Sequence, residues 1–321
     1  MSKPKLLVTR RVFPEVIRHL EGVFEVQSNP TDELWPVEEL QEKAADAEAL
    51  YVVTSDRVDE SLLAACPKLK MIATGSVGYN HIDLAACSRR GVIVTNTPDV
   101  LTEATADMAF ALLMATARRI TESERWLRQG HWQGWAWDQF LGSDVHGATL
   151  GIIGMGRIGS AVARRGRGFS MKVLYANRSV APNEAELGAT RVSREELLSQ
   201  ADHVVLVLPY SRETHHSIGA AQLALMKSTA TLINIARGGI VDDVALAQAL
   251  KDGTIAAAGL DVFEGEPTVH PALLELDNIV MTPHIGSATR SSRLAMSLLA
   301  AKNLTEVFSN REPLSAVAAP G

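Results

Sequence analysis

The chain has 321 residues, of which 46% are hydrophobic, 21% charged and 5% aromatic. This composition supplies enough apolar residues for a buried core and excludes a disordered or fibrous protein. The 31 basic and 37 acidic side chains give a formal charge of −6. Because such a chain offers no basic surface for a phosphate backbone, nucleic acid is not expected as a partner.

The sequence shows neither a membrane span nor a secretory signal. Its uncharged apolar stretches, such as residues 204–210 and 255–260, fall far short of the ~18–20 residues that cross a bilayer. The only cysteines, Cys66 and Cys87, are too few for a framework of several disulfides, which fits a reducing compartment. We therefore predict a cytoplasmic protein with no membrane partner.

Short apolar runs alternate with amphipathic segments along most of the chain, a pattern typical of α/β proteins with parallel sheets. Five strands are predicted in the first hundred residues, at 5–8, 24–27, 50–53, 71–73 and 92–95. Six more are predicted further on, at 149–153, 172–176, 203–208, 231–235, 256–260 and 279–281. Six buried strands suit a doubly wound, dinucleotide-binding Rossmann sheet.

Two long helices are predicted outside these strand series, at residues 101–128 and 291–308. The first would link two domains, and the second comes too late to be needed by the second sheet. We therefore predict a dinucleotide-binding domain over residues 101–287 and a smaller, discontinuous, flavodoxin-like substrate domain made of residues 1–100 and 288–321.

A glycine-rich segment directly follows the strand predicted at 149–153 and precedes a helical pattern. Its GxGxxG motif reads Gly154-Met155-Gly156-Arg157-Ile158-Gly159. In this context the first glycine permits the tight turn, the second lets the backbone approach a pyrophosphate, and the third lets the helix pack on the strand. Arg157 would add a cation beside the phosphates.

The next strand ends at Asn177-Arg178-Ser179, about 20 residues past the loop, where an NAD site normally presents an Asp or Glu to the ribose hydroxyl. The chain has no carboxylate there. Two neutral hydrogen-bonding groups and a guanidinium would accommodate the 2′-phosphate of NADP. We predict NADPH as the cofactor, with NADH used less well.

Three segments at predicted strand ends carry polar residues that a core would not contain: 234–239, 261–267 and 282–287. The carboxyl ends of strands border the ligand crevice of a doubly wound sheet, so these loops can converge. Hydride transfer to a 2-oxo acid needs a cation for the carboxylate, a proton donor for the carbonyl oxygen and a group that keeps the donor protonated. Arg237, His284 and Glu266 meet these needs in turn.

At these positions the chain resembles the D-isomer-specific 2-hydroxyacid dehydrogenases. The resemblance covers nearly the whole chain, since residues 76–80 and 97–103 also resemble that family's substrate loop and interdomain helix start. The most similar members are the glyoxylate/hydroxypyruvate reductases, including bacterial forms that also reduce 2-ketogluconate. The resemblance implies that Arg237, Glu266 and His284 form the catalytic set. The sequence leaves open the order of preference among hydroxypyruvate, glyoxylate and 2-ketogluconate as substrates.

The resemblance also implies ligand contacts at matching positions. The substrate carboxylate would meet the backbone N–H groups of Val77 and Gly78, and Ser287 would lie near the substrate or the nicotinamide amide. Cofactor contacts would come from the phosphate loop and from Asn177, Arg178, Ser179, Pro209 and Thr214 around the adenosine half, and from Thr105, Ala236, Asp261 and Gly286 around the nicotinamide half.

Four of the five tryptophans, Trp126, Trp132, Trp135 and Trp137, lie between the long helix and the cofactor strand. Such density indicates a buried interface. In similar reductases this region wraps the partner subunit of a homodimer, so we predict a homodimer in which Trp137 reaches the neighbouring substrate site. Packing of the four within one chain is the alternative.

Other functions fit less well. The chain has no GxSxG elbow or P-loop, and His215 and His216 are adjacent and His81 isolated, so no metal is predicted. A formate dehydrogenase-like member would carry a Gln as the partner of His, where this chain has Glu266. A dinucleotide-sensing protein resembling the C-terminal-binding corepressors remains the alternative from another class, because fold alone does not exclude it.

Overall fold

A computed structural model describes residues 2–318. The chain divides into two compact units, one running from the N-terminus to Leu101 together with the stretch from Ala288 onward, and one covering Thr102–Ser287. Residues 319–321, which the sequence also assigns to the first unit, lie outside the described residues. Within the described residues, no helix is long and apolar enough to cross a membrane.

The first unit contains a parallel sheet of five strands in the order β2-β1-β3-β4-β5. Its strands are β1 (Lys5–Val8), β2 (Glu25–Ser28), β3 (Ala49–Val52), β4 (Met71–Thr74) and β5 (Ile93–Thr95). Successive side chains enter opposite cores: Leu6 and Val8 pack with one set of helices, and Leu7 with the other. The strand order is that of flavodoxin-like sheets.

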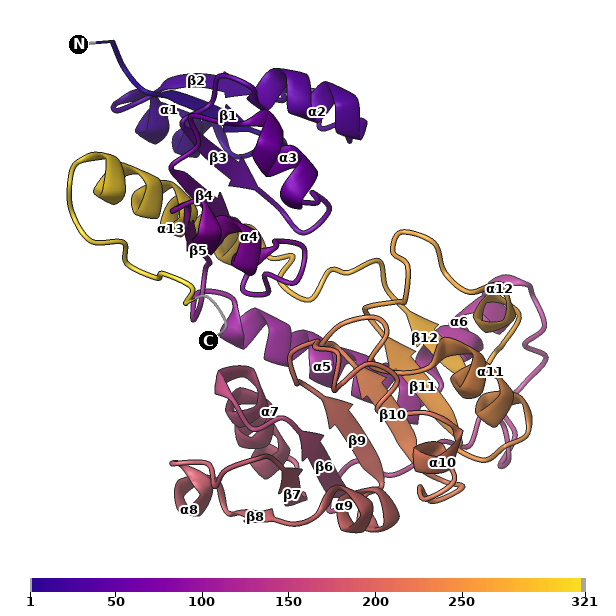
Figure 1. Cartoon of the computed structure of the whole chain (residues 1–321). Coiled ribbons are helices and arrows are strands. Elements are labelled where there is room, and N and C mark those ends of the chain that lie inside the picture. The colour runs from indigo at the N-terminus through magenta and orange to yellow at the C-terminus, as the bar shows by residue number, and fades with distance from the viewer. Residues whose placement is uncertain (1, 319–321) are drawn as a thin grey trace. The chain divides into compact units, whose positions relative to one another are not determined.

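Helices cover both faces of this sheet (Figure 1). One face carries α1 (Pro14–Glu21) and α13 (Arg290–Phe308), and the other carries α2 (Val37–Ala44), α3 (Glu60–Ala65) and α4 (Leu84–Arg89). Side-chain hydrogen bonds cap the N-terminal ends of several of these helices. The Asp59 carboxylate accepts hydrogen bonds from two amides of α3, and the Thr289 hydroxyl accepts one from Ser292 of α13. Although it comes last in the chain, α13 packs on the sheet of the N-terminal strands.

The second unit contains a parallel sheet of seven strands in the order β12-β11-β10-β9-β6-β7-β8. Its strands are β6 (Thr149–Ile153), β7 (Lys172–Ala176), β8 (Ala189–Arg191), β9 (His203–Leu206), β10 (Thr231–Asn234), β11 (Ala257–Leu260) and β12 (Ile279–Met281). The strand order reverses at the β6/β9 pair, which makes this a doubly wound Rossmann sheet with its ligand crevice at the carboxyl ends there. The predicted fold class is confirmed.

Two helical layers enclose this sheet (Figure 1). α5 (Thr102–Ala117), α7 (Arg157–Gly168) and α8 (Glu184–Leu187) pack on one face, and α9 (Arg194–Gln200), α10 (Ala220–Leu223), α11 (Asp243–Lys251) and α12 (Pro271–Leu274) pack on the other. The remaining helix, α6 (Ile120–Arg128), buries none of its residues.

Two sequence predictions need correction. The single helix predicted over residues 101–128 is two helices, because Arg119 adopts a left-handed conformation (φ 52°). In addition, the Ser143 N–H donates a hydrogen bond to the Ala117 carbonyl, which would otherwise accept one from within a continuous helix. The second sheet also has a seventh strand, β8, which is only three residues long and largely exposed, so hydrophobic patterning did not indicate it.

Candidate active site

Arg237 follows β10 on a turn that its neighbours hold in shape. The Asn234 side chain accepts a hydrogen bond from the Ala236 N–H at 3.0 Å and donates one to the Arg237 carbonyl at 3.1 Å. A Cβ at Gly238 would lie only 1.7 Å from the carbonyl oxygen of Phe263, so the loops after β10 and β11 touch through a position that only glycine can fill. The sequence named Arg237 but missed the positioning role of Asn234, which the side-chain type and the strand-end position could have indicated.

Glu266 and His284 form a direct pair in the second unit. Glu266 Oε2 and His284 Nδ1 are 2.7 Å apart, and Glu266 Oε1 accepts the N–H of Phe263 at 2.9 Å. Burial opposes ionisation of Glu266, but the hydrogen bond and charge of His284, the Phe263 N–H and the charge of Arg237 outweigh it, so the pKa of Glu266 is lowered. The carboxylate is therefore ionised at neutral pH.

Arg237 is electrostatically coupled to this pair. Burial lowers the pKa of its guanidinium, and the charge of Glu266 counters that effect. Arginine nevertheless stays protonated in proteins. The structure thus brings together a fixed cation, an ionised carboxylate and an imidazole at the ends of three adjacent strands.

The loop that carries His284 is organised by the buried Asp261. One carboxylate oxygen accepts hydrogen bonds from the Thr282 hydroxyl (2.7 Å) and the Ile285 N–H (2.8 Å), and the other accepts the Gly286 N–H (2.7 Å). His284 itself adopts a left-handed conformation, φ 52°. Sparsely populated backbone conformations of this kind persist where surrounding contacts enforce them, often at functional sites.

The phosphate loop has the geometry that its glycines suggest. Gly154 has φ 105° and a Cβ there would lie 2.8 Å from the Val207 backbone, while a Cβ at Gly159 would lie 2.1 Å from the Gly154 carbonyl oxygen. At Gly156, the residue before α7, nothing lies within 4 Å of an added Cβ. Free space at a helix N-terminus fits a pyrophosphate held by backbone N–H groups.

In the same loop, Met155 is buried, Arg157 is the first residue of α7, and Ile158 packs against the core. Gly166 lies deeper in α7, where a Cβ would meet Leu150 of β6 at 2.8 Å. No sequence pattern explains a glycine at this position. The close packing of α7 on β6 explains it, because a side chain there would overlap Leu150.

The segment after β7 is exposed, and its backbone is held by Arg191, a residue that the sequence alone did not single out. Asn177, Arg178 and Ser179 are all exposed at the carboxyl end of the strand. Arg191 of β8 donates hydrogen bonds to the backbone carbonyls of Asn177 (3.1 Å) and Arg178 (2.9 Å). Two guanidinium groups therefore belong to this corner of the sheet.

The other predicted cofactor positions lie on the loops of the same unit. The Thr214 hydroxyl accepts the Ser211 N–H at 2.7 Å and donates to the Pro209 carbonyl at 3.0 Å, which closes a turn after β9. The methyl carbon of buried Thr105 on α5 lies 3.6 Å from the Cβ position of Gly286. Ala236 is buried, and Ser287 follows Gly286 on the His284 loop.

The predicted carboxylate-binding residues, Val77 and Gly78, lie in the first unit on the loop after β4. The Asn96 side chain donates to the Val77 carbonyl at 2.8 Å and the Ser76 hydroxyl donates to the Gly78 carbonyl at 2.6 Å. Because N–H and C=O point in opposite directions across a trans peptide, holding the Val77 carbonyl also sets the direction of the Gly78 N–H.

The tryptophan-rich segment is not buried within the chain. Trp132, Trp135 and Trp137 are 58%, 70% and 86% exposed, and Leu141 beside them is 67% exposed. Trp135 and Trp137 contact each other edge to face, with centroids 4.7 Å apart. These three tryptophans are therefore not buried within the chain, although two of them contact each other.

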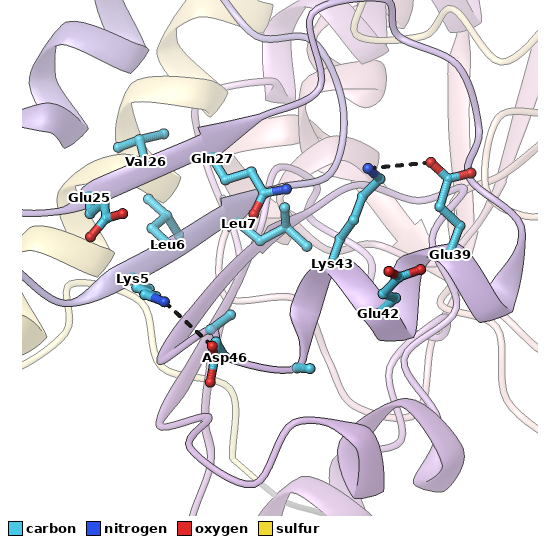
Figure 2. Close-up of a pocket in the computed structure, with 12 residues that line it drawn as sticks. Lys5, Leu6, Leu7, Glu25, Val26, Gln27, Glu39, Glu42, Lys43 and Asp46 are labelled. Carbon is cyan, nitrogen blue, oxygen red and sulfur yellow. Dashed lines mark hydrogen bonds and ion pairs between the residues drawn. The ribbon is translucent and has the colours of Figure 1, made fainter.

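A cavity of about 630 Å³ in the first unit lies apart from these loops in the sequence (Figure 2). It is bordered by β1, β2 and the end of α2, and none of the predicted site residues lines it. Its charged groups are largely matched to each other, as in the Lys5–Asp46 and Lys43–Glu39 ion pairs. The loops at the strand ends of the second unit therefore remain the candidate active site.

Comparison with known proteins decides the family. The family model described as D-isomer specific 2-hydroxyacid dehydrogenase, NAD binding domain, matches residues 110–286. A glyoxylate reductase of Thermococcus onnurineus is 50% identical over 315 residues, covering 97% of this chain and 94% of that protein. The chain belongs to the D-isomer specific 2-hydroxyacid dehydrogenase family.

Solved structures agree with this family. The TT0316 protein from Thermus thermophilus superposes with a TM-score of 0.91 at 42% identity, covering 98% of this chain and 100% of that one. An NADPH-dependent glyoxylate/hydroxypyruvate reductase from Sinorhizobium meliloti, in complex with NADP and malonate, gives 0.88 at 36% identity, covering 99% and 98%. This 2-hydroxyacid dehydrogenase is an NAD(P)-dependent oxidoreductase, as the sequence predicted.

Proposed function

We propose that this dehydrogenase reduces small 2-oxo acids to D-2-hydroxy acids with NADPH. The observation that carries the proposal is the Glu266–His284 pair, 2.7 Å apart, electrostatically coupled to the partly buried Arg237. Glyoxylate and hydroxypyruvate are the proposed substrates, in line with the names of the similar reductases, and 2-ketogluconate is a larger candidate.

In this proposal the chain handles the substrate's charge and a proton. Arg237 binds the carboxylate and polarises the 2-oxo group, and the Val77 and Gly78 amides contribute to carboxylate binding. His284 gives the Nε2 proton to the carbonyl oxygen, because its Nδ1 is held by Glu266. A bound nicotinamide cofactor would supply a hydride to the 2-oxo carbon, so one hydride and one proton would convert the 2-oxo group to a hydroxyl.

The preference for NADPH rests on the corner at β7 and β8. Asn177 stands where a carboxylate would repel a 2′-phosphate, and Arg178 and the neighbouring Arg191 supply two guanidinium groups. Arg191 also fixes the backbone that carries the other two residues. NADH lacks the 2′-phosphate and would forgo these charge-assisted contacts.

The first test compares kcat/KM for NADPH and NADH against glyoxylate, hydroxypyruvate, pyruvate and 2-ketogluconate, with the purified full chain. Fast turnover of glyoxylate or hydroxypyruvate with NADPH supports the proposal. NADPH binding without turnover of any of the four would overturn it and favour the dinucleotide-sensing alternative.

Cofactor choice has its own test. The double variant Asn177→Asp, Arg178→Ala should reverse the NADPH/NADH preference, and Arg191→Ala should weaken NADPH more than NADH. Arg57→Ala, an exposed arginine in the first unit, is the control and should leave the ratio unchanged. An unaltered ratio in the double variant contradicts the assignment.

A further inference from the structure

One group of described side chains outside the Arg237, Glu266 and His284 set has the composition of a metal site. His215, His216 and Glu264 each offer a ligand atom, and these atoms lie within 4.8 Å of one another. Two imidazole nitrogens and a carboxylate oxygen suit zinc and the other late first-row divalent metals. The sequence alone did not show this group, because the carboxylate comes from 48 residues after His216.

The group lies where three loops of the second unit meet. The two histidines follow β9, Glu264 follows β11, and the His216 N–H donates to the Gly239 carbonyl, at 2.7 Å, in the loop after β10. Gly239 has φ 76°, and a Cβ there would lie 3.4 Å from His215 Nδ1 and 3.8 Å from the Glu264 carboxyl carbon. The same Cβ would lie 3.1 Å from a ring carbon of Tyr210, so a side chain at Gly239 would crowd this group of residues and glycine preserves their arrangement.

The distances suit a metal with small adjustments. His216 Nε2 and Glu264 Oε2 are 2.7 Å apart, and two ligands of a tetrahedral metal at ordinary bond lengths are separated by about 3.3 Å. His215 stacks on His216 with ring centroids 3.9 Å apart, and its Nδ1 is 3.2 Å from the Tyr210 hydroxyl. Since His215 is exposed, its ring can rotate to complete the ligand set.

A further carboxylate supports a cation at this position. Asp242 Oδ2 lies 3.9 Å from His216 Nδ1. With Glu264, it places two carboxylates around the histidine pair, and hard or borderline divalent cations favour such negative surroundings.

We propose that His215, His216 and Glu264 form a binding site for a zinc-type divalent metal ion, which joins the loops that follow β9 and β11. Such a site exists only in the folded chain, so metal binding stabilises the folded state. The proposal does not depend on which 2-oxo acid or dinucleotide the enzyme uses.

Calorimetric titration of the untagged, metal-free protein with zinc chloride tests the proposal. We expect one zinc per chain, and an affinity at least about tenfold weaker in His215→Ala and in Glu264→Gln. His146→Ala, which removes an exposed histidine elsewhere in the same unit, is the control and should bind like the unmodified chain. Equal binding by the unmodified chain and His215→Ala, or no binding, overturns the site.

A second measurement, thermal unfolding with and without zinc, tests without an enzyme assay whether the metal joins the two loops. Zinc should raise the midpoint of thermal unfolding of the unmodified chain and of His146→Ala, and leave that of His215→Ala unchanged. Cobalt in place of zinc should give the visible absorption of a tetrahedral nitrogen and oxygen site. A zinc-induced shift that persists in His215→Ala would assign the stabilisation to another part of the molecule.

Discussion

His284 is held from two directions. Glu266 fixes its Nδ1, and Asp261 accepts hydrogen bonds from the backbone N–H groups of Ile285 and Gly286, the two residues after His284. A ring constrained in this way presents one nitrogen, Nε2, to a substrate, and orientation of an acid is a large part of its catalytic value. The same constraint explains why a left-handed backbone at His284 is tolerated.

Replacing His284 with Gln should therefore remove the proton donor and leave the fold intact. We expect kcat for glyoxylate reduction to fall by about 10²–10⁴-fold, the range of a lost general acid, while the affinity for NADPH stays unchanged. His146→Gln, an exposed histidine in the same unit, should keep normal kcat. A near-normal kcat for His284→Gln would show that another group donates the proton.

Arg237→Ala should have a different kinetic signature. The guanidinium is proposed to bind the substrate carboxylate in the ground state and to stabilise charge on the oxygen in the transition state, so its removal should lower kcat and raise KM for the 2-oxo acid. Arg237→Lys should recover only part of the loss, because an ammonium lacks the planar fork. Steady-state kinetics of both variants provide the measurement, and a change in KM alone would restrict Arg237 to substrate binding.

At the scale of elements, α7 offers a matched pair of glycines. Gly168, its last residue, has no atom within 4 Å of an added Cβ, whereas a Cβ at Gly166 would meet Leu150 at 2.8 Å. We expect Gly168→Ala to stabilise the protein by about 0.5 kcal/mol through a less flexible unfolded chain. Gly166→Ala should destabilise it by about 1 kcal/mol through overpacking.

Chemical denaturation of the two α7 variants beside the parent chain measures these changes. The comparison is sharp because both substitutions are the same and lie in the same helix. Equal effects of Gly166→Ala and Gly168→Ala would show that helix propensity, and not contact with β6, decides the outcome.

The elements that sequence patterns predict well are those whose periodicity and burial agree. The buried strands of both sheets fall within two residues of their predicted bounds, because runs of Val, Ile and Leu between turns have few other interpretations. The break at Arg119 was missed because it is caused by Ser143, which contacts Ala117 from a distant part of the chain. Tertiary contacts of this kind leave no local pattern.

The candidate site shows the same division. Arg237, Glu266 and His284 could be named because polar residues at strand ends contradict a core. The positioning role of Asn234 could have been inferred from its side-chain type and its place at a strand end. That of Arg191 could not be separated from ordinary surface chemistry without the three-dimensional structure. Asp261, predicted as a cofactor contact, uses both carboxylate oxygens to build the His284 loop, a role that its sequence position does not reveal.

For the whole molecule, the exposed aromatic segment predicts assembly. Trp132, Trp135, Trp137 and Leu141 together present apolar surface that a monomer would leave in water. We expect a homodimer in sedimentation velocity, and a shift toward monomer in the double variant Trp135→Ser, Trp137→Ser. A dehydrogenase that is monomeric and fully active at assay concentration would remove both the dimer and the proposed role of Trp137 at a neighbouring substrate site.

The stability of the whole molecule should depend on pH through His203, a fully buried histidine at the start of β9. Its Nε2 donates to the Asp144 carbonyl at 3.0 Å, so its Nδ1 accepts from the Thr231 hydroxyl at 2.8 Å and the ring is satisfied while neutral. Burial lowers the pKa of His203, and the Asp144 hydrogen bond and the nearby Asp202 charge only partly counter it.

The sign of the effect follows from proton uptake. An unfolded histidine takes up a proton as the pH falls through about 6.5, and His203 in the folded protein does so only at lower pH. Between these two values the unfolded chain binds more protons, so stability is lost as the pH falls. Urea unfolding at about pH 7.5 and 5.5 should show a larger loss for the parent chain than for His203→Gln, whose side chain cannot be protonated. Equal losses in the two proteins would mean that His203 does not set the acid limit of the fold.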